Sequence, residues 1–111
     1  MIYIIQNSTL YRVNPESGQS TELTSGWSGT TLMTSDEKYL YIICHGTIYR
    51  VDKNDGSYVE ISGGWSGAIS ISVFENNLFC IEGSRLYKID KQSGTYNSDY
   101  MGVWEGSCII S

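Results

Sequence analysis

The chain has 111 residues, enough for one domain, and its net charge of −5 argues against a surface for nucleic acid or an anionic membrane. Hydrophobic residues make up 41% of it, but no apolar run is long enough to span a membrane, and the N-terminal Met-Ile-Tyr-Ile-Ile lacks the basic region of a signal peptide. We therefore expect a cytoplasmic protein, with secretion without a signal peptide as the alternative. Nine Tyr, three Trp, 12 Gly and a single Pro favour a β-rich fold with tight turns.

One unit recurs three times at a step of 38 residues. The sequence Leu-Tyr-Arg-Val-Asn at 10–14 returns as Ile-Tyr-Arg-Val-Asp at 48–52 and as Leu-Tyr-Lys-Ile-Asp at 86–90. A Trp-x-Gly motif follows in each copy, after one extra residue in the third. It occupies Trp27 to Gly29, Trp65 to Gly67 and Trp104 to Gly106. A fixed period of this size indicates a repeat architecture, in which each unit buries its apolar faces against its neighbours.

The predicted elements are short strands from end to end. Residues 1–25 hold the N-terminal strands, and the second copy shows the whole unit, because runs of β-branched and aromatic residues alternate there with turn residues. Its four predicted strands are Thr30 to Thr34, Tyr39 to Cys44, Thr47 to Asp52 and Ser57 to Ser62. Short hairpin turns join the second and third strands of each unit. They are Asn7-Ser8, His45-Gly46 and Gly83-Ser84. No stretch has sustained helical periodicity, so we predict an all-β fold.

The connection between the third and fourth strands is a candidate metal site. Asp-Lys-Asn-Asp-Gly at 52–56 resembles the opening of a calcium loop, but the matching segments 14–18 and 90–94 carry fewer oxygen donors and no bidentate Glu follows. A turn capped by the Asx side chain is the favoured interpretation. No His/Cys cluster suits zinc, so we expect no metal and no cofactor. Three cysteines (Cys44, Cys80 and Cys108) at different repeat positions argue against a disulfide framework.

Four antiparallel strands repeated at about 40 residues are the signature of a β-propeller blade. We predict that residues 1–111 form a single three-blade half-propeller, whose C-terminal strand 107–111 and N-terminal strands 1–25 are parts of one shared blade. Because propellers typically need ~4–8 blades to close, we predict a homodimer of six blades, in which each chain completes the blade begun by its partner. A trimer of nine blades and a fragment of a longer propeller are the alternatives.

A family resemblance adds to this interpretation. Gly-Gly-Trp-Ser-Gly at 63–67, the Tyr-Leu-Tyr at 39–41 and the Leu/Ile-Tyr-Arg/Lys of the third strand resemble the repeat of tachylectin-type β-propeller lectins. The chain departs from those lectins in its shorter repeat and in lacking their Asp-Asn-Trp segment. Its third-strand pattern is also similar to many bacterial propeller repeats. The resemblance implies a non-enzymatic lectin with shallow sugar sites between adjacent blades.

The expected sites lie on one rim of the propeller. There the connection between successive blades lies beside the turn that joins strands two and three, so each Trp should lie next to a hairpin turn. An indole can stack on a pyranose, and a nearby glycine lets backbone N–H groups approach it. The predicted ligand-binding residues are Trp27, Gly29, Trp65, Gly67, Trp104, Gly106, Asn7 and His45. The alternative is that the Trp residues are wedges packed between blades and that His45 is only a turn residue.

Other functions have less support. With a single His, no Ser-His-Asp set is indicated, and no carboxylate pair recurs, so we predict that the chain is not an enzyme. The alternative function is a protein-interaction or assembly scaffold without sugar binding. A sugar site needs an exposed aromatic ring beside hydrogen-bonding groups, whereas a protein site would show a broader apolar patch.

Overall fold

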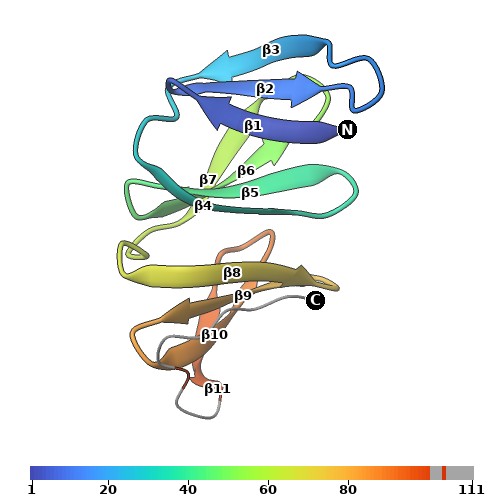
Figure 1. Ribbon diagram of the computed structural model, residues 1–111. Helices are drawn as coiled ribbons and strands as arrows, with labels where there is room; N and C mark the ends of the chain where they lie inside the picture. Colours follow the sequence, from blue (N-terminus) through green and yellow to red (C-terminus); the bar gives the residue numbers. More distant parts are fainter. Residues whose placement is uncertain (101–103, 105–111) are drawn as a thin grey trace.

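The computed structural model describes residues 1–100 and 104, and within them it is all-β, as predicted (Figure 1). The strands form three antiparallel sheets in chain order. The first sheet has β1 (Ile2–Gln6), β2 (Thr9–Val13) and β3 (Ser20–Ser25). The second has β4 (Thr30–Ser35), β5 (Tyr39–Cys44), β6 (Thr47–Asp52) and β7 (Tyr58–Ser62). The third has β8 (Ala68–Phe74), β9 (Asn77–Glu82), β10 (Arg85–Asp90) and β11 (Tyr96–Tyr100).

The predicted four-stranded unit is confirmed in the second and third sheets. In the second sheet β5 and β6 have the predicted bounds, whereas β4 ends one residue later and β7 begins one residue later than expected. The two-residue hairpins have positive φ at Asn7 and Ser8 (51° and 65°) and at His45 and Gly46 (50° and 76°). Positive φ at both central residues matches the right-handed twist of the flanking strands.

The turns between the third and fourth strands are closed by Asx side chains. Asn14 Oδ1 accepts a hydrogen bond from the backbone N–H of Glu16 (2.8 Å), and Asp52 and Asp90 accept the equivalent bonds (2.7 and 2.8 Å). The glycine that ends each turn has a φ of 74° to 76°. This is the predicted Asx-capped turn. Among the residues that the structure describes, no group of three His, Cys, Asp or Glu could hold a metal ion.

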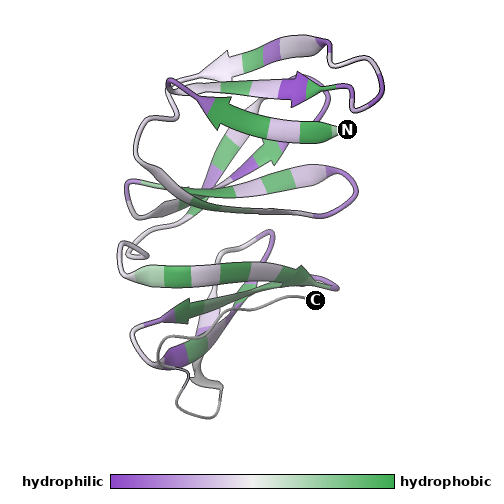
Figure 2. Ribbon diagram, in the orientation of Figure 1, coloured by the Kyte–Doolittle hydropathy of each residue, from purple (hydrophilic) through white to green (hydrophobic). Residues whose placement is uncertain are grey.

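The sheets pack face to face, and the core lies between them. Along β5, Leu40 and Ile42 pack with Leu10 of the first sheet, while Tyr41 and Ile43 pack with Leu78 of the third. Strand β5 is therefore buried on both faces, which explains why its sequence, Tyr-Leu-Tyr-Ile-Ile-Cys, is nearly all aliphatic and aromatic. Figure 2 shows green segments along the strand with paler ones between them. The first strands of the second and third sheets, β4 and β8, contact each other.

The first sheet differs because it has three strands and begins with β1, the counterpart of β5. Ile2 and Ile4 are 47% and 43% exposed, whereas Leu40 and Ile42 at the same repeat positions are 3% and 0% exposed. One face of β1 is thus about half exposed, although its sequence is that of a buried strand. The predicted strand 107–111 lies outside the described residues, so its addition to this sheet stays a prediction.

Candidate functional site

The structure brings each Trp of the repeat against the hairpin turn predicted to lie beside it. The backbone N–H of Trp27 donates to Ser8 O (2.9 Å), that of Trp65 to Gly46 O (2.8 Å) and that of Trp104 to Ser84 O (2.9 Å). The same bond in all three units arises because the connection between sheets returns to the end where strands two and three are joined. Each Trp therefore lies next to a hairpin turn, as expected; we call this side of the sheets the Trp rim.

The indoles on this rim are mostly inside the protein. Trp27 and Trp65 are 3% and 2% exposed, and Trp65 packs edge-to-face against Tyr87 and Tyr96, with ring centroids 5.1 and 5.4 Å apart. Trp27 has the equivalent contacts with Tyr49 and a second tyrosine. Stacking on a sugar needs an exposed ring face, so these two indoles act as wedges between sheets. Trp104 is 43% exposed.

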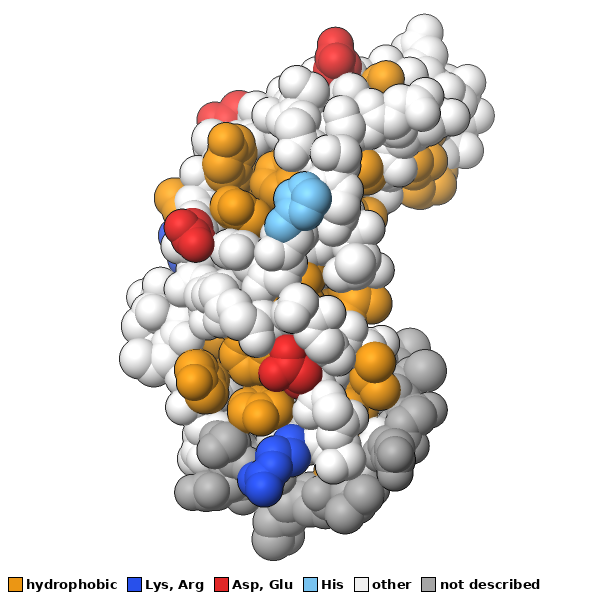
Figure 3. Space-filling model, turned by 90° about the vertical axis from the view of Figure 1, so that its left-hand side faces the viewer, with side chains coloured by type: hydrophobic (Ala, Val, Ile, Leu, Met, Phe, Trp, Pro, Cys, Tyr) orange, Lys and Arg blue, Asp and Glu red, His pale blue; other side chains and the backbone are white. Residues whose placement is uncertain are grey.

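The other predicted rim residues meet protein groups. The imidazole of His45 covers Gly29 so closely that a Cβ there would collide with the ring, and the N–H of Gly67 donates to Glu82 Oε2 (3.2 Å). Asn7 and His45 are exposed at their turns, and His45 is visible in pale blue on this face (Figure 3). Gly106 lies outside the described residues.

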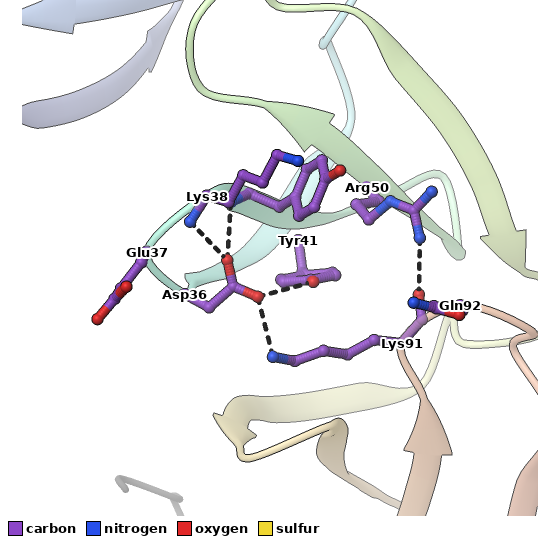
Figure 4. A pocket seen from close by; sticks show the side chains of 8 residues that line it. Asp36, Glu37, Lys38, Tyr41, Arg50, Lys91 and Gln92 are labelled. Carbon is purple, nitrogen blue, oxygen red and sulfur yellow. Dashed lines mark hydrogen bonds and ion pairs between the residues drawn. The ribbon is translucent and has the colours of Figure 1, made fainter.

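A cavity lies at the opposite ends of the strands, between the second and third sheets (Figure 4). Its volume is about 520 Å³. The loop from β4 to β5, the start of β5 and a side chain of β6 form one wall, and the turn from β10 to β11 forms the other. It is lined by Asp36, Glu37, Lys38, Tyr39, Tyr41, Arg50, Lys91 and Gln92. This cavity, which we call the Asp36 pocket, combines charged groups of both signs with aromatic rings.

Asp36 is the centre of a hydrogen-bond network in this pocket. Its Oδ2 pairs with Lys91 Nζ (2.9 Å) and accepts from Tyr41 Oη (2.9 Å), while its Oδ1 accepts the backbone N–H groups of Lys38 (2.9 Å) and Tyr39 (2.7 Å). Burial raises the pKa of Asp36, but the bonds from Lys91 and the other donors outweigh it and lower the pKa to about 2. Burial and the bond to Asp36 raise the pKa of Tyr41. The carboxylate is therefore ionised and the phenol neutral at neutral pH.

Cations gather around this carboxylate. Arg50 and Lys38 lie over the ring of Tyr39, with charge-to-centroid distances of 5.0 and 5.3 Å, and Lys91 lies 5.7 Å from the ring centre of Tyr41. With Lys53, whose Nζ donates to Asp36 O, four of the chain's seven Lys and Arg residues surround the Asp36 loop. The pocket is therefore a locally basic place in an acidic chain, suited to a polar ligand that carries negative charge.

Sequence reasoning missed the Asp36 pocket because Asp36 and Lys38, which lie in its loop, have no like residue in the other copies. Asp36 and Lys91 lie 55 residues apart, in different copies of the unit. The repeat places Phe74 where Asp36 stands and Pro15 where Lys91 stands. The available signal was the charged segment Asp36-Glu37-Lys38, which appears in one copy only, whereas Arg50 and Lys91 recur as Arg12 and Lys53.

Comparisons with known proteins bear on the fold. No family model and no curated protein sequence matches the chain. Among solved structures, it is similar to the extracellular domain of BT4673 from B. thetaiotaomicron, at 22% identity and a TM-score of 0.67, over 90% of this chain and 15% of that one. A second structure of that domain matches at 19% identity and a TM-score of 0.63, over 89% of this chain and 16% of that one. The N-terminal domain of Nup159 matches at 13% identity and a TM-score of 0.62, over 88% of this chain and 27% of that one.

These likenesses define the class of fold. At such low identities they show the architecture only, and with the three successive antiparallel sheets they support a β-propeller-like, all-β fold. The chain spans between 15% and 27% of the length of these neighbours. Within the described part of the chain, no helix is long and apolar enough to cross a membrane.

Proposed function

We propose that the chain is a non-enzymatic carbohydrate-binding module, and that its ligand is an acidic sugar held in the Asp36 pocket. The observation that carries this proposal is the 520 Å³ cavity between two sheets, in which Asp36 is paired while cations remain at the mouth. A site between adjacent blades is also what the resemblance to tachylectin-type lectins implies. The proposed site lies at the end of the strands opposite the Trp rim.

The chemistry of the lining suggests how such a ligand would be held. Arg50 donates one Nη1 hydrogen bond to Lys91 O (3.3 Å), and a guanidinium has five N–H donors, so it can also bind a carboxylate. Lys38 is exposed beside it and adds a second positive charge. Glu37 and Gln92 are exposed at the two walls and offer partners to sugar hydroxyl groups. Each site should be weak, because the cavity is open and the ligand well hydrated.

Weak sites gain from multivalency, and we propose that two chains close into a six-bladed ring. The support for closure is the apolar strand β1, whose Ile2 and Ile4 are exposed where the equivalent residues of β5 are buried. Two chains would present two Asp36 pockets and raise avidity on a glycan-dense surface. Deleting residues 108–111 should abolish the dimer if these residues complete the partner's sheet. An unchanged mass in sedimentation would contradict that part of the proposal.

The same exposed residues favour a second candidate, a protein-interaction or assembly scaffold. Exposed apolar groups on the first and third sheets, Ile2 and Ile4 in β1 and Phe74 at the end of β8, are the kind of surface that binds protein. Phe74 is 54% exposed. The two candidates differ in where the ligand binds. Binding of a sugar should depend on the residues of the Asp36 pocket, and binding of a polypeptide on Ile2, Ile4 and Phe74.

The test is a glycan array followed by titration with glucuronate and with neutral glucose. We expect acidic glycans to bind and Arg50→Gln to reduce that binding at least about 10-fold, since a charge-assisted bond is lost. Arg12→Gln is the matched control, because Arg12 Nη1 makes the same bond to Lys53 O (3.3 Å) in the first interface, outside the pocket. His45→Ala tests the Trp rim.

The outcomes separate the possible sites. Loss of binding in Arg50→Gln but not in Arg12→Gln or His45→Ala supports the Asp36 pocket. Loss in His45→Ala only would move the site to the Trp rim. If no glycan binds to the wild-type protein, the carbohydrate proposal is overturned and the scaffold becomes the better candidate.

A further inference from the structure

Two contacts between neighbouring sheets are built from the same repeat positions. In the first interface Lys53 lies over the ring of Tyr3, 5.4 Å from its centre, and in the second Lys91 lies over Tyr41 at 5.7 Å. In each, an arginine of the preceding sheet donates to the carbonyl of that lysine at 3.3 Å. The chain therefore shows twice how the turn between the third and fourth strands of one sheet docks on the sheet before it.

The first and third sheets each have a neighbouring sheet on one side only among the described residues. On the other side they carry the repeat positions of this contact with different side chains. On the third sheet Phe79 stands where the other sheets have Tyr3 and Tyr41, and Phe74 stands where the second sheet has Asp36. On the first sheet Pro15 stands where the others have lysine. Phe74 is 54% exposed, its ring centre lies 6.4 Å from that of Phe79, and Pro15 is exposed. All three polar members of the internal contact are thus replaced by apolar residues.

We propose that Phe74 and Phe79 of one chain receive Pro15 of a second copy of this chain, in the position that Lys91 takes against Asp36 and Tyr41 within the chain. The inference rests on the ring closure proposed above and names the contact that makes it. An apolar ring pair and a proline complement each other because both remove apolar surface from water, whereas Asp36 and Lys91 attract each other through opposite charge.

The surroundings of both ends fit this partner. Lys88 occupies the repeat position of Arg50, which donates a hydrogen bond across the second interface. Beside Lys88 on the third sheet lies a hollow of about 280 Å³, whose lining includes Asn77, Lys88 and Tyr96. The hollow lies where the turn that contains Pro15 would dock in the proposed contact.

A glycine on the first sheet points the same way. Gly56 and Gly94 pack against the neighbouring sheet, and a Cβ on Gly94 would collide with Ile61 O. Their counterpart Gly18 has no described atom within 4 Å of such a Cβ. The first sheet thus keeps a docking turn whose neighbour is missing from the described chain.

The difference in chemistry also explains why a second copy would dock in the correct order. Pro15 placed against Asp36 would leave a carboxylate without its ammonium. The Asp36 contact therefore favours Lys91, and the Phe74 and Phe79 pair is left for Pro15 of the second copy. Both halves of the proposed contact are present on every copy, so no other protein is required.

The experiment is a charge exchange measured by sedimentation equilibrium and light scattering. We expect the wild-type protein to be a dimer, and Phe74→Asp and Pro15→Lys each to weaken the dimer at least about 10-fold. The combined variant recreates the Asp36–Lys91 pair and should regain most of the affinity. Val59→Asp, which places the same charge on an exposed residue of β7, should leave the dimer unchanged. Far-UV circular dichroism checks that each variant is folded.

The outcomes distinguish failure of the proposed contact between Pro15 and Phe74 from failure of the proposed closure of two chains into a ring. A wild-type protein that is monomeric at all concentrations overturns both the closure and the contact. A wild-type dimer that neither single substitution weakens overturns the contact but leaves the closure standing. A dimer weakened by both single substitutions and not recovered in the combined variant overturns the pairing of Pro15 with Phe74.

Discussion

Replacement of Asp36 by Asn tests whether charge, rather than shape, holds the second and third sheets together at the pocket. The amide keeps an oxygen for the N–H groups of Lys38 and Tyr39, but it removes the negative charge that pairs with Lys91 Nζ at 2.9 Å. The lowering of the Asp36 pKa from 3.8 to about 2 corresponds to at most about 2.4 kcal/mol. Because this side chain is 22% exposed, solvent screening reduces the expected loss to about 1–2 kcal/mol at neutral pH.

The dependence on pH gives the sharper result. A carboxylate with a depressed pKa stabilises the folded state fully above its unfolded pKa of 3.8, and this stability is lost as the pH falls toward about 2. Urea unfolding of wild type and Asp36→Asn at one protein concentration should therefore show a difference at neutral pH that shrinks to roughly a third near pH 2.5. Glu37→Gln is the matched control and should change the free energy of unfolding by less than about 0.5 kcal/mol. A loss of equal size at both pH values would refute the electrostatic explanation.

Three other predictions follow from burial and backbone geometry. Trp65→Ala should lower the free energy of unfolding in urea by about 3–5 kcal/mol, because the indole is 2% exposed. The same change at Trp104, which is 43% exposed, should cost much less. A tolerated Trp65→Ala would contradict the packing role. Gly94→Ala should lose at least about 2 kcal/mol more than Gly64→Ala, since both have positive φ but only Gly94 has a backbone oxygen in the way; equal losses would show that φ by itself is responsible. Burial, and then the charge of a nearby carboxylate, raises the pKa of Cys80 to about 12, and both described cysteines are buried. At most one of the chain's three cysteines should therefore react with a thiol reagent before unfolding. Fast reaction of two cysteines would contradict this.

Much of the fold was predictable because it is local and repeated. Turn residues at a fixed step of 38 residues mark the strand ends, so the bounds of β5 and β6 could be predicted to the residue. The contact of each Trp with a hairpin turn followed from topology, since antiparallel strands return to the same end. The exposure of each indole could not be predicted, because it depends on how Tyr49 and Tyr87 of the adjacent strands close around it.

The sequence by itself determined an all-β chain of three units, with a rim that carries Trp and an opposite rim that carries Asx turns. Only the tertiary structure decided that Trp27 and Trp65 are wedges and that Asp36 meets Lys91 across two sheets. The physical reason is that periodicity reports which residues share a position within a unit. It does not report which residues of neighbouring units come into contact. That contact is set by how the sheets pack, and between the second and third sheets it brings Asp36, which occurs in one copy only, against Lys91.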